Sequence, residues 1–289
     1  MHWIPVAAIA LVAAATPLAQ QAAAPANTLT AQEKADGWVL LFDGTHAGQS
    51  LRGYKKEAMP DAWKVEEGCL VLRGQGGDIL TKDQWDNFEF QVDWNIAPGG
   101  NSGIMYRVTE DGTYPWETGQ EMQVLDDSKH PDGKNRLTSA GSCYALYAAP
   151  EGVVKPAGEW NTARIVAVGP KITYYLNGTK VVEFDMSSAE YKERLAKSKF
   201  ASMPMFGTKT KGHIALQDHG DVVKYRNIKV RPLGADGKAA PATKAAPATG
   251  AKPATGGTPA TGSTPAGGGA PATKPSGGGA GSGTPKAGA

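Results

Sequence analysis

Short alternating or apolar runs recur through the middle of the chain, each bounded by Gly, Pro, Asn or Asp. Such runs are typical of β-strands, in which successive side chains point to opposite faces. The pattern predicts about eleven strands, at residues 38–44, 69–74, 88–96, 102–108, 121–126, 143–148, 163–169, 171–178, 180–185, 213–220 and 222–230. Strands of this number and spacing predict an all-β sandwich.

The clearest turn lies between the strands predicted at 171–178 and 180–185. Asn177 and Gly178 supply the two positive φ values that a tight primed turn requires. The sequence therefore predicts a β-hairpin here.

A helical pattern appears in one segment, residues 187–199. Ser187 and Glu190 have the spacing of a capping box, and Tyr191 and Leu195 lie one turn apart. We expect this helix to cover an end or an edge of the sandwich.

Strand parity separates a core face from a mixed face. In the strand at 121–126, Met122 and Val124 share one side and therefore mark the core. The same parity on the strands at 102–108 and 213–220 predicts one shared polar face, which carries Arg107, Glu121, Gln123, His213 and Gln217. This face either binds a polar ligand or is an ordinary solvated face of an antiparallel sheet.

The strand at 121–126 continues into an unusually polar loop, with Asp126, Asp127, His130, Asp132 and Asn135. A histidine exchanges protons near neutral pH, and a neighbouring carboxylate can orient it. Three interpretations remain open: a reaction centre, a calcium loop whose spacing does not match an EF-hand, and an ordinary turn.

A second polar cluster ends the strand at 213–220, where Gln217 is followed by Asp218 and His219. Loops after strands commonly carry working groups, although Asp218 is equally suited to cap a turn. Tyr144 and Trp160 are suited either to stack on a sugar or to fill the core.

The two ends of the chain differ from its middle. Residues 4–15 are apolar and too short to span a bilayer, which predicts a signal peptide at 1–24 and a periplasmic or secreted protein. Residues 234–289 are rich in Ala, Pro, Thr and Gly, which predicts a disordered tail that contacts the cell wall or another protein. One folded domain at 29–233 remains, and no transmembrane segment is expected after signal removal.

Charge and motifs exclude several classes. The net charge is +2, and the tail holds five lysines and one Asp, so no basic groove for nucleic acid is expected. The chain has no zinc-type Cys spacing, no GxSxG, no HExxH and no phosphate loop. Cys69 and Cys143 are the two cysteines; they either form a disulfide or remain buried thiols.

Six motifs occur in order and resemble the 3-keto-disaccharide hydrolase domain family: WVLLFDG, PGGNSGIMYRV, EMQVLDDSKH, AGSCYALYAAP, GEWNTARIVAVGPKITYYLNG and GHIALQDHGDVVKYRNIKVRPL. The similarity extends from about residue 37 to residue 233. It implies a concanavalin- or laminin-G-like β-sandwich (jelly roll). It also implies an exported enzyme that cleaves sugars oxidised to a ketone at C3.

That activity needs a base near C2 and donors at the C3 oxygen. We assign His130 or Glu121 as the base, with Asp126 orienting the histidine. Arg107 and Gln123 are expected to face the keto oxygen. A divalent metal bound by the loop at 126–132 is an alternative electrophile. Further substrate contacts are assigned to Gln217, His219, Tyr144 and Trp160.

Two rival functions are weighed against this one. An ordinary glycosidase would pair Glu121 with Asp126, but a regular strand places residues five apart on opposite faces. A non-catalytic carbohydrate-binding module would bind mainly through the aromatic residues Trp116, Tyr144 and Trp160.

Overall fold

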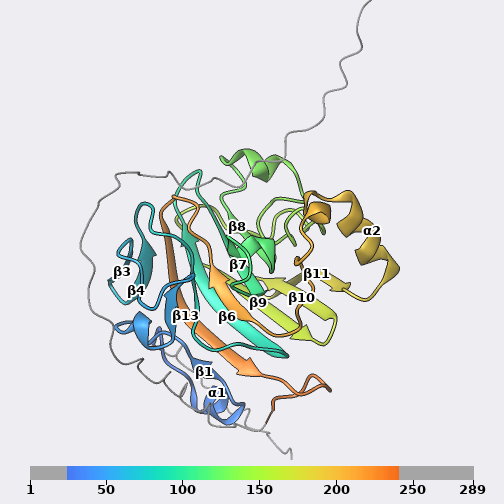
Figure 1. The fold of residues 1–289 in the computed structure, drawn as a ribbon. Helices are drawn as coiled ribbons and strands as arrows, with labels where there is room; N and C mark the ends of the chain where they lie inside the picture. Colours follow the sequence, from blue (N-terminus) through green and yellow to red (C-terminus); the bar gives the residue numbers. More distant parts are fainter. Residues whose placement is uncertain (1–24, 241–289) are drawn as a thin grey trace, which may run out of the picture.

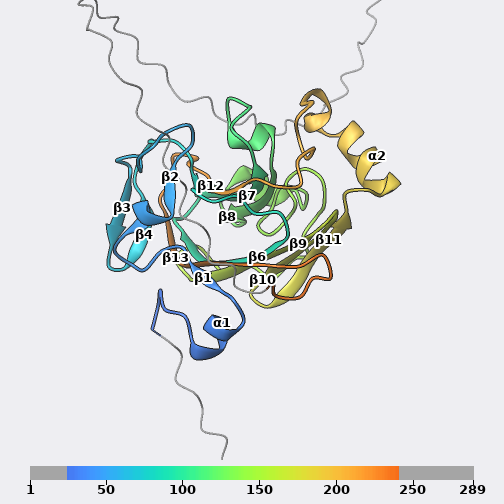
Figure 2. The same ribbon diagram turned by 60° about the horizontal axis from the view of Figure 1, so that its bottom comes forward.

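The chain forms two antiparallel β-sheets that pack face to face, as seen in a computed structural model that describes residues 25–240. The expected signal segment at 1–24 and the part of the expected tail at 241–289 lie outside the described residues. Figures 1 and 2 show the larger sheet, with β6 and β13 at its centre, lying against the smaller sheet of β7, β8 and β12. This arrangement confirms the predicted all-β sandwich.

The larger sheet has the strand order β11-β10-β9-β6-β13-β4-β3, and β1 also pairs with β13. Its strands are β1 (Val39–Leu40), β3 (Trp63–Glu66), β4 (Cys69–Leu72), β6 (Phe88–Ile96), β9 (Asn161–Val168), β10 (Lys171–Leu176), β11 (Thr179–Asp185) and β13 (Val223–Pro232). The smaller sheet has the order β2-β5-β12-β7-β8. Its strands are β2 (Leu51–Gly53), β5 (Ile79–Thr81), β7 (Asn101–Val108), β8 (Gln120–Leu125) and β12 (His213–Leu216).

The core lies between the sheets and is built by alternation along the strands. In β6 the alternation of the sequence buries one large side chain at every second position, namely Phe88, Phe90, Val92, Trp94 and Ile96. The smaller sheet contributes Ile104, Met122, Val124, Ile214 and Leu216 to the same cluster. Two buried hydroxyl pairs cross the interface: Tyr106 with Tyr174 at 2.7 Å and Ser102 with Tyr225 at 2.8 Å.

The predicted hairpin is confirmed. Asn177 has φ 51° and Gly178 has φ 82°, and these two residues connect β10 to β11. The side-chain amide of Asn177 also donates to the backbone of Val153, which fixes the turn to a neighbouring loop.

The strand predicted at 143–148 is wrong. The amides of Leu146 and Tyr147 both donate to the carbonyl of Cys143, and Ala145 has φ 61°, so the chain makes a tight turn. These residues are apolar because the loop is buried. The strands β2, β3 and β5 were not predicted, since each is only three or four residues long.

The predicted helix at 187–199 is present as α2 (Ala189–Lys197). Its cap differs from the expectation: Ser188, not Ser187, accepts from the amide of Tyr191, while Ser187 bonds to Asp185. A second short helix, α1 (Ala31–Ala35), begins at Thr30 with a capping box to Glu33. Figure 2 shows α1 below the larger sheet and α2 at one side of the sandwich.

Four 3-10 turns complete the fold: η1 (Ala47–Gln49), η2 (Pro115–Glu117), η3 (Pro131–Lys134) and η4 (Lys199–Ser202). Cys69 and Cys143, both within the described residues, are thiols that are not joined by a disulfide. Between residues 25 and 240, the helices are too short or too polar to cross a membrane.

Candidate active site

The outer face of the smaller sheet, which turns away from the larger sheet, carries buried polar side chains. Glu121, Gln123 and Gln217 are only 3%, 1% and 3% exposed. Their strand neighbours Met122 and Leu216 lie in the core between the sheets, as parity predicted. The alternative of a solvated outer face is therefore wrong, because this face is covered.

Strand register aligns four residues across this face. Gln123 lies opposite Gly103, and the amide of Gln217 donates to the carbonyl of Gly103 at 2.9 Å. The pairing of β12 with β5 places Asp78, just before β5, beside Gln217. Two amides, one glycine and one carboxylate thus form a row across β8, β7, β12 and the start of β5.

Glu121 lies next to this row and bends over Gly103. A Cβ atom at position 103 would lie 2.2 Å from Oε1 of Glu121 and 2.9 Å from its Cδ. Only glycine leaves room for the carboxylate there, since contacts this close are strongly repulsive. The Glu121 carboxylate is therefore held above β7, between its own strand and the strands that carry Gln217 and Asp78.

Several amide groups on this face lack a hydrogen-bond partner within the described structure: both polar atoms of Gln123, Oε1 of Gln217 and Oδ1 of Asn101. Buried polar groups are nearly always satisfied, because each missing hydrogen bond costs about 1–3 kcal/mol. Their concentration beside Glu121 indicates a site that is completed by a polar molecule.

Asp78 is the second carboxylate of the site. Its Oδ1 accepts from the amide of Asp218 at 2.8 Å. Burial, together with the charges of Asp218 and Glu121, raises the pKa of Asp78 to about 7, although the hydrogen bond from the Asp218 amide acts to lower it. A carboxyl group with such a pKa can hold a proton near neutral pH and release it during a reaction.

Asp218 holds the glycine loop before Asp78 in place. Its Oδ2 accepts from the amides of Gly76 and Gly77 at 2.6 and 2.7 Å, and its Oδ1 accepts from Gly220. The predicted turn-capping role of Asp218 is confirmed.

Tyr144 borders the site on the side of β8. Its amide donates to the carbonyl of Glu121 at 3.0 Å, and its hydroxyl donates to Asp132 at 3.2 Å. The residue is 2% exposed, and the ammonium of Lys199 lies 4.3 Å from the ring centroid. Tyr144 is thus fixed beside the backbone of Glu121, and its contact with substrate stays a prediction.

Two histidines lie together beside the start of β7. The rings of His130 and His219 are in edge contact, with centroids 6.2 Å apart, and Nδ1 of His219 lies 3.7 Å from Asp221. Nδ1 of His130 accepts from the amide of Asp132 at 3.1 Å, so in the neutral ring the proton resides on Nε2. Nε2 in turn faces the side-chain amide of Asn101 at 3.5 Å.

This arrangement weakens the case for His130 as a base, because its lone pair already accepts a hydrogen bond. The predicted pair of Asp126 and His130 is wrong: the Asp126 carboxylate accepts from the amide of Gly99 and from Ser128. Asp126 is 3% exposed and shapes the loop. Both of its carboxylate oxygens are engaged by these bonds.

The other loop carboxylates are similarly engaged. Asp127 accepts from the amide of Ala140 and lies 3.5 Å from Arg136, and Asp132 accepts from Tyr144. No group of three or more His, Cys, Asp or Glu side chains within residues 25–240 is arranged to hold a metal ion. The loop at 126–132 therefore does not supply the expected ligand set.

Arg107 does not face the site, which corrects the predicted common face. The residue has φ 53° and forms a bulge in β7, so parity reverses between Tyr106 and Val108. Its guanidinium donates to the carbonyls of Asp86 at 3.2 Å and Gly169 at 2.7 Å. Arg107 therefore links β7 to the turn between β9 and β10.

The remaining predicted aromatic contacts divide between the two sheets. Trp160 stacks on Arg226 of β13 at 4.0 Å, on the larger sheet, so it does not join the other site residues. Trp116 stacks on Tyr114 and packs against the apolar part of the site face. His213 is on that face too, but its ring bonds to the carbonyl of Thr81 and to Gln84.

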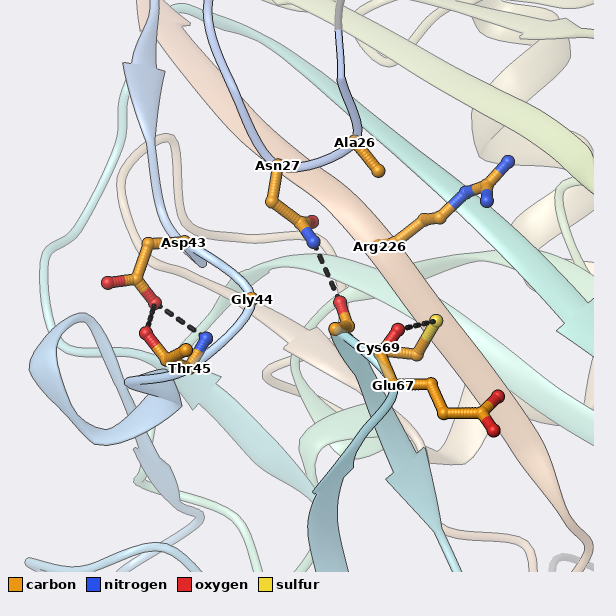
Figure 3. A pocket seen from close by; sticks show the side chains of 9 residues that line it. Ala26, Asn27, Asp43, Gly44, Thr45, Glu67, Cys69 and Arg226 are labelled. Carbon is orange, nitrogen blue, oxygen red and sulfur yellow. Dashed lines mark hydrogen bonds between the residues drawn. The ribbon is translucent and has the colours of Figure 1, made fainter.

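A polar pocket of about 390 Å³ lies elsewhere, between β4, β13 and the first described residues (Figure 3). Its polar groups bind one another: Asn27 donates to Gly68, and Asp43 accepts from Thr45. Bonds from His46 and Thr45 hold the pKa of Asp43 far below its usual value. None of the residues around Glu121 lines this pocket.

Two residues of the site were missed by sequence reasoning, Asp78 and Lys199. Asp78 follows a Gly-Gly pair and precedes β5, a strand of three residues that has no visible period. Lys199 is the last residue of the predicted helix at 187–199, and no sequence motif marks it as a functional residue. Only the sheet register and the path of η4 bring them to Glu121 and Tyr144.

Comparison with known proteins matches most of the described domain to one family. A family model described as a 3-keto-alpha-glucoside-1,2-lyase-like domain matches residues 37–231. A 3-keto-disaccharide hydrolase from Bacteroides thetaiotaomicron is 33% identical over 243 residues, which cover 73% of this chain and 83% of that protein.

Solved structures show the same relationship. A candidate glycosyl hydrolase from Parabacteroides distasonis is 33% identical with a TM-score of 0.68, and the match covers 73% of this chain and all of that chain. A second protein of that description and organism is 30% identical with a TM-score of 0.54, over 68% of this chain and 99% of the other. The sandwich described above is therefore shared with these proteins.

Proposed function

Since this chain belongs to the family of 3-keto-alpha-glucoside-1,2-lyase-like domains, we propose that it cleaves the glycosidic bond of 3-keto-glycosides or 3-keto-disaccharides. The names of the Bacteroides and Parabacteroides relatives support a hydrolase of carbohydrates. The name of the Bacteroides relative supports a 3-keto sugar as substrate, and the name of the family supports elimination across C1 and C2.

A ketone at C3 makes the C2 proton acidic. When a base removes that proton, the C–H electron pair forms C2=C3 and the carbonyl π pair moves to the C3 oxygen. The enolate then re-forms the ketone, C1=C2 forms, and the C1–O bond breaks with the electron pair leaving on the aglycone oxygen. Addition of water, as OH to C1 and H to C2, completes net hydrolysis.

We assign Glu121 as the base. The observation that carries the proposal is the position of its carboxylate, over Gly103 and beside the unsatisfied amides of Gln123 and Gln217. A carboxylate in a buried, polar site is suited to general-base catalysis, which typically contributes roughly 10²- to 10⁴-fold. The amides of Gln123 and Gln217 supply donors and acceptors for sugar hydroxyls.

Asp78 is assigned as the acid that protonates the departing oxygen. With a pKa of about 7, a substantial fraction of this carboxyl group holds a proton at neutral pH. Glu121 and Asp78 reach the site from β8 and from the start of β5, so a sugar ring between them would be approached from two sides.

An ordinary glycoside hydrolase is the second candidate, because a pair of carboxylates with one raised pKa also fits that reaction. The two functions differ in the need for the ketone. An ordinary hydrolase cleaves an unoxidised glycoside, whereas the elimination depends on the acidity that the C3 carbonyl confers on C2.

The test compares 4-nitrophenyl 3-keto-α-glucoside with 4-nitrophenyl α-glucoside, each with and without a chelator. We expect nitrophenolate release from the keto substrate and none from the unoxidised glucoside. Glu121→Gln should lower kcat by at least about 10²-fold, and the surface variant Glu183→Gln should match the wild type. Lack of release from the keto substrate by folded, metal-supplied protein would refute the proposal, and cleavage of the unoxidised glucoside would favour the second candidate.

Export to the periplasm or the cell exterior accompanies this proposal, on the basis of the apolar segment at residues 4–15. Fractionation of cells that express the full chain, with N-terminal sequencing of the product, tests it. A product that keeps Met1 and stays in the cytoplasm would count against export.

A further inference from the structure

Lys199 brings a positive charge to the site from outside the sheet. It is the first residue of η4, directly after α2, and Ser198 fixes the turn by accepting from the amide of Phe200 at 3.1 Å. Nζ of Lys199 is shielded from solvent, although the residue lies in a connecting segment. A lysine in such a segment usually extends into water, whereas this ammonium group lies inside the protein.

The ammonium group lies against Tyr144, with Nζ 4.3 Å from the ring centroid. Tyr144 is fixed in turn by its amide, which donates to the carbonyl of Glu121, and by its hydroxyl, which donates to Asp132. Two hydrogen bonds and one cation–π contact thus hold the charge of Lys199 next to the strand that carries the base.

The proposed reaction needs a hydrogen-bond donor at the C3 oxygen, where a positive charge is favourable, and Arg107 does not serve because it points to Asp86 and Gly169. We propose that Lys199 is a catalytic residue whose ammonium group binds the C3 oxygen of the substrate and stabilises the enolate. This inference rests on the proposed function and adds to it the residue that recognises the ketone.

In this assignment Lys199 donates a hydrogen bond to the carbonyl oxygen of the bound sugar. As Glu121 takes the C2 proton, negative charge grows on that oxygen, and its attraction to the ammonium group increases. The interaction is therefore stronger in the transition state than with bound substrate, which is the condition for catalysis. The proton stays on Lys199, and the charge returns to the sugar when the C1–O bond breaks.

The alternative is that Lys199 only attaches η4 to Tyr144 through the cation–π contact. A purely structural role predicts lower stability and equal effects on ketone and alcohol ligands. A catalytic role predicts a selective effect on enolate formation.

Enolate formation can be measured apart from glycosidic cleavage with 3-keto-1,5-anhydroglucitol, which has no exocyclic leaving group at C1. In D₂O, exchange of its C2 hydrogen, followed by NMR, reports proton removal alone. We expect wild-type protein to catalyse this exchange, Lys199→Met to slow it by about 10²- to 10³-fold, and Lys199→Arg to restore part of the rate. Lys192→Met, on the exposed side of α2, is the matched control.

Binding of unoxidised 1,5-anhydroglucitol and the thermal unfolding temperature are measured for each variant. The inference is supported when the exchange falls while these two values stay close to those of the wild type. The inference is overturned when the Lys199→Met protein catalyses exchange of the C2 hydrogen at the wild-type rate. It is also overturned when Lys199→Arg restores the unfolding temperature without restoring any of the exchange rate. Failure of the proposed function itself looks different, because then the wild type exchanges no hydrogen.

Discussion

At the scale of single residues, the site depends on one glycine within a strand and on one carboxyl group with a raised pKa. Gly103 lets the Glu121 carboxylate lie across β7, and burial gives Asp78 a pKa of about 7. A glycine within a strand normally weakens it, so Gly103 is explained by the carboxylate that it accommodates. Each residue makes a prediction that can be measured independently.

Gly103→Ala should remove activity while the fold is retained. The new Cβ would meet Oε1 of Glu121 at 2.2 Å, so the carboxylate must move away from the strand. A displacement of about 1 Å can cost roughly 10²-fold in rate. The measurement is kcat on the keto substrate; Gly48→Ala, whose Cβ would lie 3.8 Å from Met59, is the control. Equal kcat for Gly103→Ala and the wild type would contradict the assigned position of Glu121.

Asp78→Asn should change how stability depends on pH. The folded pKa of about 7 lies above the usual 3.8, so between these values the folded state binds more protons than the unfolded state. The favourable contribution of Asp78 is present below about pH 4 and is lost as pH rises through about 7. Asp78→Asn lacks this loss. Its free energy of unfolding relative to that of the wild type should therefore increase as pH rises across that range. The increase is about 1.4 kcal/mol for each pH unit by which the folded pKa exceeds the unfolded pKa.

Urea unfolding of both proteins at a series of pH values measures this change. A stability difference that is constant with pH would show that the Asp78 pKa is not raised. The same variant tests the acid role: release of a poor leaving group, such as a sugar, should slow more than release of 4-nitrophenolate.

At the scale of elements, the bulge in β7 turns Arg107 away from the face of the sheet that carries the site. Met105 faces the site, and after the bulge Val108 faces the same side, while Arg107 extends to Asp86 and Gly169 instead. The bulge thus uses one residue of a site strand to hold the smaller sheet to the β9–β10 turn of the larger one. Alternation could not reveal this, because a single extra residue reverses the parity that follows it.

Arg107→Met should lower the free energy of unfolding by about 2 to 4 kcal/mol, because it leaves the carbonyls of Asp86 and Gly169 without their donor. In the fraction that remains folded, kcat should stay within a few-fold of the wild type. Urea unfolding and kcat are the two measurements. A large loss of kcat without loss of stability would return Arg107 to the site, as the sequence pattern first suggested.

At the scale of the whole molecule, the described domain extends slightly past the predicted boundary at Leu233. Leu233 pairs with Ala239, and the amide of Ala240 donates to the carbonyl of Pro232, so the chain folds back on β13 before position 241. The site is formed by β5, β7, β8, β12 and the loops next to them, all before this point.

Removal of residues 241–289 should leave kcat/KM unchanged, because no residue assigned to the site lies in that segment. Turnover of the keto substrate by the truncated and full chains is the measurement, and a clear loss of turnover would show that the boundary is misplaced. Truncation after Leu233 is a stricter comparison. It should lower the unfolding temperature, since it removes the pairing of Leu233 with Ala239.

Much of this protein follows from its sequence alone. Alternation and turn residues determine the longer β-strands, the hairpin at Asn177 and Gly178, and the opposite faces of Met122 and Glu121, because these depend on neighbours along the chain. The tertiary structure alone decided which polar residues meet. Asp78 lies near Glu121, and Lys199 lies against Tyr144, whereas Arg107, Asp126 and Trp160 make their contacts elsewhere. Strand register, one bulge and the hydrogen bonds of each loop decide this, because they place side chains that are far apart in sequence.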